Sequence, residues 1–88
     1  MSHMNRGAHR RCRNPRPEEV RALWEWSGLT EAAFGDLICA SEGAVQQWKS
    51  DVGTQGHRRM HGGFWCLIQL ELGLDPTKPL GPQIAKKR

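Results

Sequence analysis

Hydrophobic residues between Pro17 and Leu74 recur at the spacing of short amphipathic helices. The clearest case is residues 29–48, where two apolar segments follow each other closely, each behind a hydroxyl residue. Thr30 and Ser41 suit the N-cap position, because a side-chain hydroxyl accepts a hydrogen bond from an unpaired N–H of the first turn. The apolar faces consist of Ala33, Phe34 and Leu37 in the first segment and of Val45 and Trp48 in the second. The pattern therefore predicts two short helices joined by a tight turn at residues 38–40.

Further helices are predicted on both sides of this pair. Pro17 suits the first position of a helix and Gly28 the left-handed residue after a helix end, so we expect a helix over residues 17–27. Its inward face consists of Val20, Leu23, Trp24 and Ser27. A last strong helix is expected over residues 64–72, before Gly73. The apolar band of this last helix is wide, which indicates either a dimer contact or a helix packed in the core.

The other segments lack helical periodicity. Residues 5–16 carry five arginines and are expected to form a flexible arm, after Met1-Ser2-His3, which resembles a cloning remnant. Residues 50–63 carry four glycines and are expected to form a loop. The chain is therefore divided into residues 1–16 (remnant and basic arm), 17–75 (helical domain) and 76–88 (disordered basic tail). The predicted fold is a compact all-α domain of four to five helices.

Composition limits the kinds of protein this can be. With 88 residues, of which 38% are hydrophobic, the chain forms one small domain. No stretch approaches the roughly 20 apolar residues of a membrane-spanning helix, and we expect no signal peptide and a cytoplasmic protein. Cys12, Cys39 and Cys66 form no Cys-x-x-Cys pair, which indicates free thiols in a reducing compartment, with Cys39 and Cys66 as small core residues. No second ligand pair accompanies His9 and Cys12, so we expect no metal and no cofactor.

Charge is distributed unevenly along the chain. The formal net charge is +4, but residues 1–16 carry +5, residues 17–50 carry −4 and residues 51–88 carry +3. The helical centre is therefore acidic and the ends are basic. If the protein binds nucleic acid, the arm, the loop and the tail must supply the attraction for phosphate.

The helix that follows Ser41 has a polar face suited to recognition. Opposite Val45 and Trp48 it carries Glu42, Gly43, Gln46, Gln47 and Lys49. A glutamine amide can hydrogen-bond adenine in the major groove of DNA, and a glutamate can accept from cytosine. A second helix that presents such a face is the helix-turn-helix arrangement. The alternative is an ordinary helical hairpin whose polar face is solvated.

Residues 29–48 resemble the helix-turn-helix of lambda-repressor-like (Xre-type) regulators. The resemblance rests on Leu29, Thr30, Ala33, Gly35, Ser41, Val45 and Trp48. It extends over about residues 17–74. Within this range, a later segment is similar to small plasmid and phage regulators, including those beside anti-CRISPR genes, at Arg59-Met60, Phe64-Trp65 and residues 67–70. Three features depart from the family pattern. Glu31 stands where the family usually has glutamine, Lys49 replaces a glutamate, and the loop at residues 50–61 is long. The resemblance implies a lambda-repressor-like fold.

The expected function is that of a transcriptional repressor that binds an inverted repeat of double-stranded DNA as a homodimer. The residues expected to read bases are Glu42, Gly43, Gln46 and Gln47, and those expected near phosphates are Thr30, Glu31, Ser41, Lys49, Arg58 and Arg59. The residues expected at the dimer interface are Phe64, Trp65, Ile68 and Leu72. No membrane is expected as a partner.

A second interpretation is a protein-binding module, such as an antitoxin that covers a toxin surface. The acidic centre together with Trp26 and Trp65 motivates it. An enzyme is not expected, because the sequence shows no carboxylate pair in a plausible cleft, no nucleophile beside a base and no phosphate-binding glycine loop.

Overall fold

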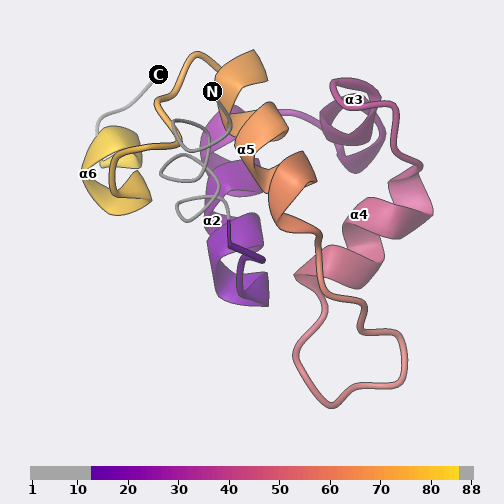
Figure 1. Cartoon of the computed structure of the whole chain (residues 1–88). Coiled ribbons are helices and arrows are strands. Elements are labelled where there is room, and N and C mark those ends of the chain that lie inside the picture. The colour runs from indigo at the N-terminus through magenta and orange to yellow at the C-terminus, as the bar shows by residue number, and fades with distance from the viewer. Residues whose placement is uncertain (1–12, 86–88) are drawn as a thin grey trace, which may run out of the picture.

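The structure, a computed structural model, describes residues 13–85 of the chain, and in this range it is all-helical, with no strand. Its five helices are α2 (Pro17–Ser27), α3 (Glu31–Asp36), α4 (Glu42–Lys49), α5 (Gly62–Glu71) and α6 (Leu80–Ile84). Figure 1 shows α3 and α4 along one edge of the molecule and α6 at the opposite edge, with a long loop projecting between α4 and α5. The predicted all-α class and number of helices are confirmed for the described residues.

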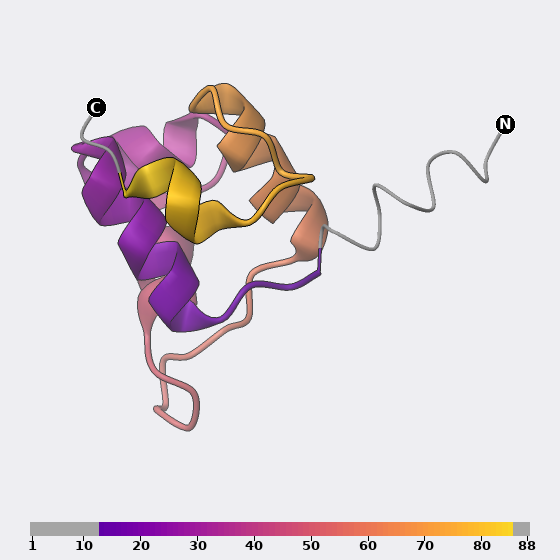
Figure 2. The same ribbon diagram turned by 90° about the vertical axis from the view of Figure 1, so that its left-hand side faces the viewer.

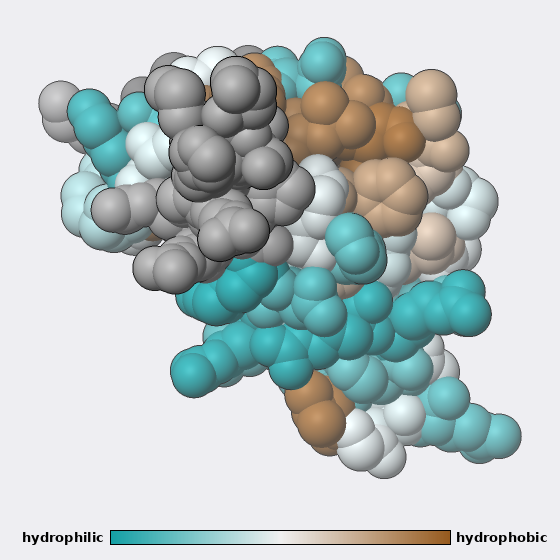
Figure 3. All heavy atoms as spheres, viewed as in Figure 1, coloured by the Kyte–Doolittle hydropathy of each residue, from teal (hydrophilic) through white to brown (hydrophobic). Residues whose placement is uncertain are grey.

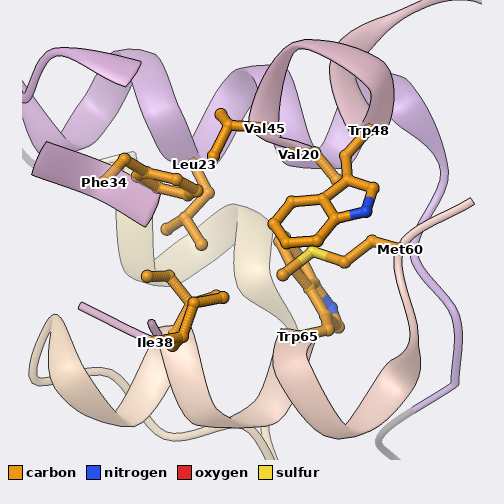
Figure 4. Packing of buried hydrophobic residues seen from close by; sticks show 9 residues of the cluster. Val20, Leu23, Phe34, Ile38, Val45, Trp48, Met60 and Trp65 are labelled. Atoms are coloured by element: carbon orange, nitrogen blue, oxygen red, sulfur yellow. The ribbon is translucent and has the colours of Figure 1, made fainter. Parts of the chain in front are cut away.

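One hydrophobic core joins α2, α3, α4 and α5. Its nine buried side chains are Val20, Leu23, Phe34, Ile38, Val45, Trp48, Met60, Trp65 and Ile68 (Figure 4). Ile38 comes from the turn between α3 and α4 and Met60 from the end of the loop. The two connecting segments are therefore held by buried side chains as well as by the helices they join.

The predicted helix ends around α3 and α4 are confirmed. The Thr30 hydroxyl accepts a hydrogen bond from the N–H of Ala33 (3.1 Å), and the Ser41 hydroxyl accepts one from the N–H of Ala44 (3.0 Å). Gly28 ends α2 in the left-handed region, with φ at 73°. These short-range signals fix where the chain enters and leaves each helix.

The turn between α3 and α4 requires a glycine at its base. A Cβ atom on Gly35 would lie 2.6 Å from the carbonyl oxygen of Ala40, which is far inside normal contact. The same two residues form the hydrogen bond that closes the turn, from the N–H of Ala40 to the carbonyl of Gly35 (2.9 Å). Cys39 lies in this turn with φ at 59° and is exposed, so its predicted place in the core is wrong.

The N-terminal end of α5 lies earlier than predicted. The helix begins at Gly62 instead of Phe64, because the ring nitrogen Nδ1 of His61 accepts a hydrogen bond from the N–H of Gly63 (2.9 Å). The N–H of Gly62 donates to the side chain of Asn14 (2.8 Å). Two glycines that read as loop residues are therefore the first turn of a helix.

Segments next to both ends of the chain are folded onto the domain, contrary to the predicted boundaries at residues 17 and 75. Pro15 is buried, and the Arg59 guanidinium donates to the carbonyls of Asn14 and Pro15. The predicted disordered tail forms α6, which packs Leu80 and Ile84 against the core (Figure 2). The rest of the predicted arm and tail, residues 1–12 and 86–88, lies outside the described residues.

Two of the predicted dimer-interface residues are core residues instead. Trp65 is 4% exposed and Ile68 is fully buried, whereas Phe64 remains partly exposed and Leu72 is half-buried. The wide apolar band of α5 is divided between the core, which covers Trp65 and Ile68, and the exposed side of the helix, where Phe64, Leu67 and Leu70 lie. Cys66 is disulfide-bonded, so the expectation of three free thiols is also wrong.

Candidate functional site

The outward face of α4 is polar and open to solvent. Glu42, Gly43, Gln46 and Gln47 are exposed, whereas Val45 and Trp48 on the opposite face belong to the core. Because α4 lies at the edge of the molecule (Figure 1), this face forms part of the outer surface. The structure thus brings together all four residues expected to read bases.

Behind this face, four side chains from three helices form a polar cluster, which we call the Trp24–Lys49 cluster. The Lys49 ammonium forms an ion pair with Glu31 and lies 3.4 Å from the centroid of the Trp24 ring. Gln46 Nε2 donates to Glu31 Oε1 (3.1 Å). The Lys49 side chain is only 14% exposed. The cluster therefore ties α4 to both α2 and α3.

The Trp24–Lys49 cluster changes the interpretation of Lys49 and Glu31. Both were expected near phosphates, but each is paired with the other in this half-buried cluster. The hydrogen bond from Lys49, with a smaller contribution from Gln46, lowers the pKa of the Glu31 carboxyl below its usual value. Glu31 is therefore a carboxylate at neutral pH, and Lys49 is not free to contact a phosphate.

The two arginines of the loop have different surroundings. Arg59 donates from Nε to the carbonyl of Pro15 (3.1 Å) and from its terminal nitrogen to that of Asn14 (2.9 Å), so it holds the segment before α2. Arg58 is exposed, and its backbone N–H donates to the carbonyl of Gln47 (3.2 Å) at the end of α4. Of the two, Arg58 has the geometry of a surface cation beside α4.

The base of the loop is anchored to α2. Arg21 donates to the carbonyl of Lys49 and to the carboxylate of Asp51, the latter at 2.9 Å. His57 forms a hydrogen bond with the carbonyl of Ser50 (2.9 Å). The loop therefore leaves and re-enters the domain at fixed points, and Arg58 lies at the re-entry.

The part of the chain that the structure describes is slightly acidic. Residues 13–85 contain seven Lys and Arg against nine Asp and Glu, a formal charge of −2. Residues 1–12 and 86–88 add three basic residues each and no acid. The positive charge of the whole protein therefore comes from the chain ends.

A separate apolar patch lies on the exposed side of α5. We call it the α5 patch, and it consists of Phe64, Leu67 and Leu70, which are 43%, 40% and 58% exposed. Figure 3 shows a hydrophobic area in this part of the surface, apart from the hydrophilic side chains lower in the view. Its spacing of three residues places the patch along one side of the helix.

A small polar pocket lies beside α6, at the opposite edge of the molecule from α4 (Figure 1). Its volume is about 220 Å³, and an ion pair between Arg13 and Glu19 (2.7 Å) forms part of its wall. The hydrogen bond from Arg13 lowers the pKa of the Glu19 carboxyl. Within residues 13–85 no cluster of three or more His, Cys, Asp or Glu is arranged to hold a metal ion.

Comparison with known protein families, with curated proteins and with solved structures finds no match to this chain. In the part of the chain that the structure describes, no helix is long and apolar enough to cross a membrane.

Proposed function

We propose that this protein is a sequence-specific DNA-binding regulator of transcription, a repressor that binds an inverted repeat as a homodimer. In this proposal α3 and α4 form a lambda-repressor-like helix-turn-helix, and α4 enters the major groove. The observation that carries the proposal is the α4 face, where Glu42, Gly43, Gln46 and Gln47 are exposed on a helix whose other face is held in the core.

The shape of α4 suits this role. It is eight residues long and begins at a side-chain N-cap, so its first turn is well defined. A Cβ atom on Gly43 would meet only the Ser41 hydroxyl, at 3.9 Å, so a groove wall can approach the backbone closely there. Gln46 and Gln47 carry both donors and acceptors for base edges.

Phosphate attraction has a different source in this proposal. The described residues carry a net negative charge, and two of the predicted phosphate-binding cations, Lys49 and Arg59, are engaged within the protein. Arg58, together with the basic residues of 1–12 and 86–88, supplies the positive charge that meets the phosphates. In this proposal α4 recognises the bases, and basic residues elsewhere in the chain attract the phosphates.

The first test is selection of binding sites from random duplex DNA, followed by gel-shift measurements with variants. Gln46→Ala and Gln47→Ala should each weaken binding to the selected site by about 1–3 kcal/mol and relax its sequence preference. If both variants bind the selected site as tightly as the native protein, α4 is not the reading helix.

The second test uses a pair of charge variants. Arg58→Ala should weaken binding to all sequences and reduce the slope of log K against log salt by about one. Lys78→Ala removes the same charge two residues before α6, the helix at the opposite edge from α4 (Figure 1), and should have a smaller effect. Equal losses for the two variants would argue against α4 as the side that faces DNA.

A second candidate function is a protein-binding module, and the α5 patch favours it, because three exposed apolar side chains along one helix suit a protein partner. Trp65, which suggested this function together with Trp26 and the acidic centre, is buried and no longer supports it. The discriminating experiment is retention of random duplex DNA at about 50 mM salt, since nonspecific binding is largely electrostatic. No retention would favour the protein partner.

A further inference from the structure

The side-chain amide of Gln46 has a fixed direction. Its Nε2 lies 3.1 Å from Glu31 Oε1. A carboxylate has no hydrogen to donate, so the atom that faces it must be the amide nitrogen. The amide oxygen of Gln46 is then the end that points away from Glu31, and the amide cannot rotate by 180° without placing two oxygens together.

Glu31 is itself held in place. Its other oxygen pairs with the Lys49 ammonium, and Lys49 in turn lies over the ring of Trp24. The Trp24–Lys49 cluster thus connects α2 and α3 to Gln46 on the exposed face of α4. Gln47, the neighbouring amide, has no side-chain hydrogen bond to any residue in the range 13–85 that would orient it in this way.

The two ends of a glutamine amide suit different bases. In the major groove adenine and cytosine present an amino donor, whereas guanine and thymine present a carbonyl acceptor at the equivalent place. An amide that is free to rotate can satisfy either kind of base. An amide whose oxygen is held outward meets an amino group favourably and a carbonyl oxygen unfavourably.

We propose that Glu31 is a specificity-determining positioning residue, which holds Gln46 so that it selects an amino-bearing base, adenine or cytosine, over guanine or thymine at one position of the DNA site. This inference rests on the proposed DNA-binding function. In it Glu31 contacts neither base nor phosphate and acts only through Gln46.

The test measures base preference at that position separately from total affinity. After site selection with the native protein, duplexes that differ at this one base pair are compared in competition gel shifts. The native protein should prefer the amino-bearing base by about 5- to 150-fold, the range expected for a good base contact. Glu31→Gln, which can accept from or donate to Gln46, should reduce this preference to less than about threefold.

Two controls separate positioning from charge and from folding. Glu18→Gln removes one negative charge from an exposed residue of α2 and should leave the preference unchanged. Gln46→Met keeps the length of the side chain without its polar atoms and should lose the preference even if Glu31→Gln folds poorly. Circular dichroism checks that each variant retains its helices.

The possible results are distinct. A preference for an amino-bearing base that Glu31→Gln abolishes, while affinity for random DNA is kept or increased, supports the inference. A selected site whose preference is the same in Glu31→Gln overturns the inference and leaves the proposed function in place. Failure to select any site overturns the proposed function and this inference with it.

Discussion

At the scale of single residues, the turn between α3 and α4 depends on the absence of a side chain. The backbone of Ala40 returns so close to Gly35 that a Cβ atom there would lie 2.6 Å from a carbonyl oxygen and 3.2 Å from a methyl group of Val45. Backbone cannot move aside as a flexible side chain can. The angle between α3 and α4, and with it the direction of the α4 face, follows from this contact.

Gly35→Ala should therefore destabilise the protein by about 1–3 kcal/mol, the usual cost of overpacking a tight site. Gly43→Ala is the matched control, because its Cβ would meet only the Ser41 hydroxyl at 3.9 Å. Because Gly43 lies in the first turn of α4, this second change should stabilise by less than the roughly 1 kcal/mol expected in a helix interior. Urea unfolding followed by circular dichroism measures both, and equal free energies of unfolding for the two variants would contradict the close contact.

The start of α5 depends on one side chain in a similar way. His61→Ala removes the acceptor for the N–H of Gly63 and should lower the free energy of unfolding by about 1 kcal/mol. His61→Asn, which is also a good N-cap residue, should restore most of that loss. Urea unfolding of the two variants checks this, and an alanine variant as stable as the asparagine variant would show that the cap is dispensable.

At the scale of the elements, α4 is held in the domain by hydrophobic burial on its inner face and by polar contacts at its last turn. Val45 and Trp48 bury its inner face, and the Trp24–Lys49 cluster holds its last turn to α2 and α3. Lys49 is half-buried, and its ammonium lies against the aromatic ring of Trp24 and the carboxylate of Glu31. Replacing Lys49 would therefore disturb packing as well as charge, so Arg58 is the better residue for testing phosphate contacts.

The carboxylates of these element contacts make stability depend on pH. The pKa of Glu31 is lowered by hydrogen bonds from Lys49 and Gln46, and that of Glu19 mainly by its hydrogen bond with Arg13. A lowered pKa in the folded state stabilises the protein above the unfolded-state pKa, and this stabilisation is lost as pH falls through the folded-state value. We therefore expect the free energy of unfolding to decrease from pH 6 towards pH 3.

The variant Glu19→Gln/Glu31→Gln tests the source of this decrease. It should be less stable than the native protein at pH 7 and should show a flatter dependence of stability on pH. Both proteins are measured by urea unfolding at several pH values. If the double variant loses stability as steeply as the native protein on acidification, these two carboxylates are not the cause.

The features that were predictable from sequence are those set by neighbouring residues. Thr30, Ser41 and Gly28 act within one turn of their own helix, so their residue types were sufficient to predict where helices begin and end. The exposed α4 face followed from helical periodicity in the same way. The pairing of Glu31 with Lys49 gives no such signal, because eighteen residues separate them and only the tertiary fold brings them together.

The errors have the same physical origin. The prolines after α5 and the glycines at its start are typical of loops and tails, yet contacts between residues distant in sequence order both segments. Asn14 binds Gly62, 48 residues away, and Leu80 and Ile84 pack on the core. Burial of Trp65 and Ile68 likewise depends on which elements cover α5, which periodicity alone does not reveal.

At the scale of the whole molecule, the proposed function gives the C-terminal part of the chain two separable roles. In α6, Gln83 accepts from the N–H of Asp75 (2.8 Å) and donates to its carbonyl (2.9 Å), while Leu80 and Ile84 pack against the core. The last three residues are all basic and follow α6. Stability should therefore depend on α6, and electrostatic attraction to DNA on the residues after it.

Two truncations test this division. A chain that ends at Lys78 loses α6 and with it the half-buried side chains of Leu80 and Ile84. Complete burial of a Leu or Ile side chain contributes about 1.5–3 kcal/mol, so this truncation should lower the free energy of unfolding by roughly 2–3 kcal/mol. A chain that ends at Ala85 should unfold at the same urea concentration as the native protein. It should nevertheless bind random duplex DNA more weakly, with a salt slope reduced by up to about 2.7, because up to three phosphate contacts are removed. Loss of stability in the chain that ends at Ala85, or an unchanged salt slope for that chain, would show that the basic end does not act as an independent phosphate-binding segment.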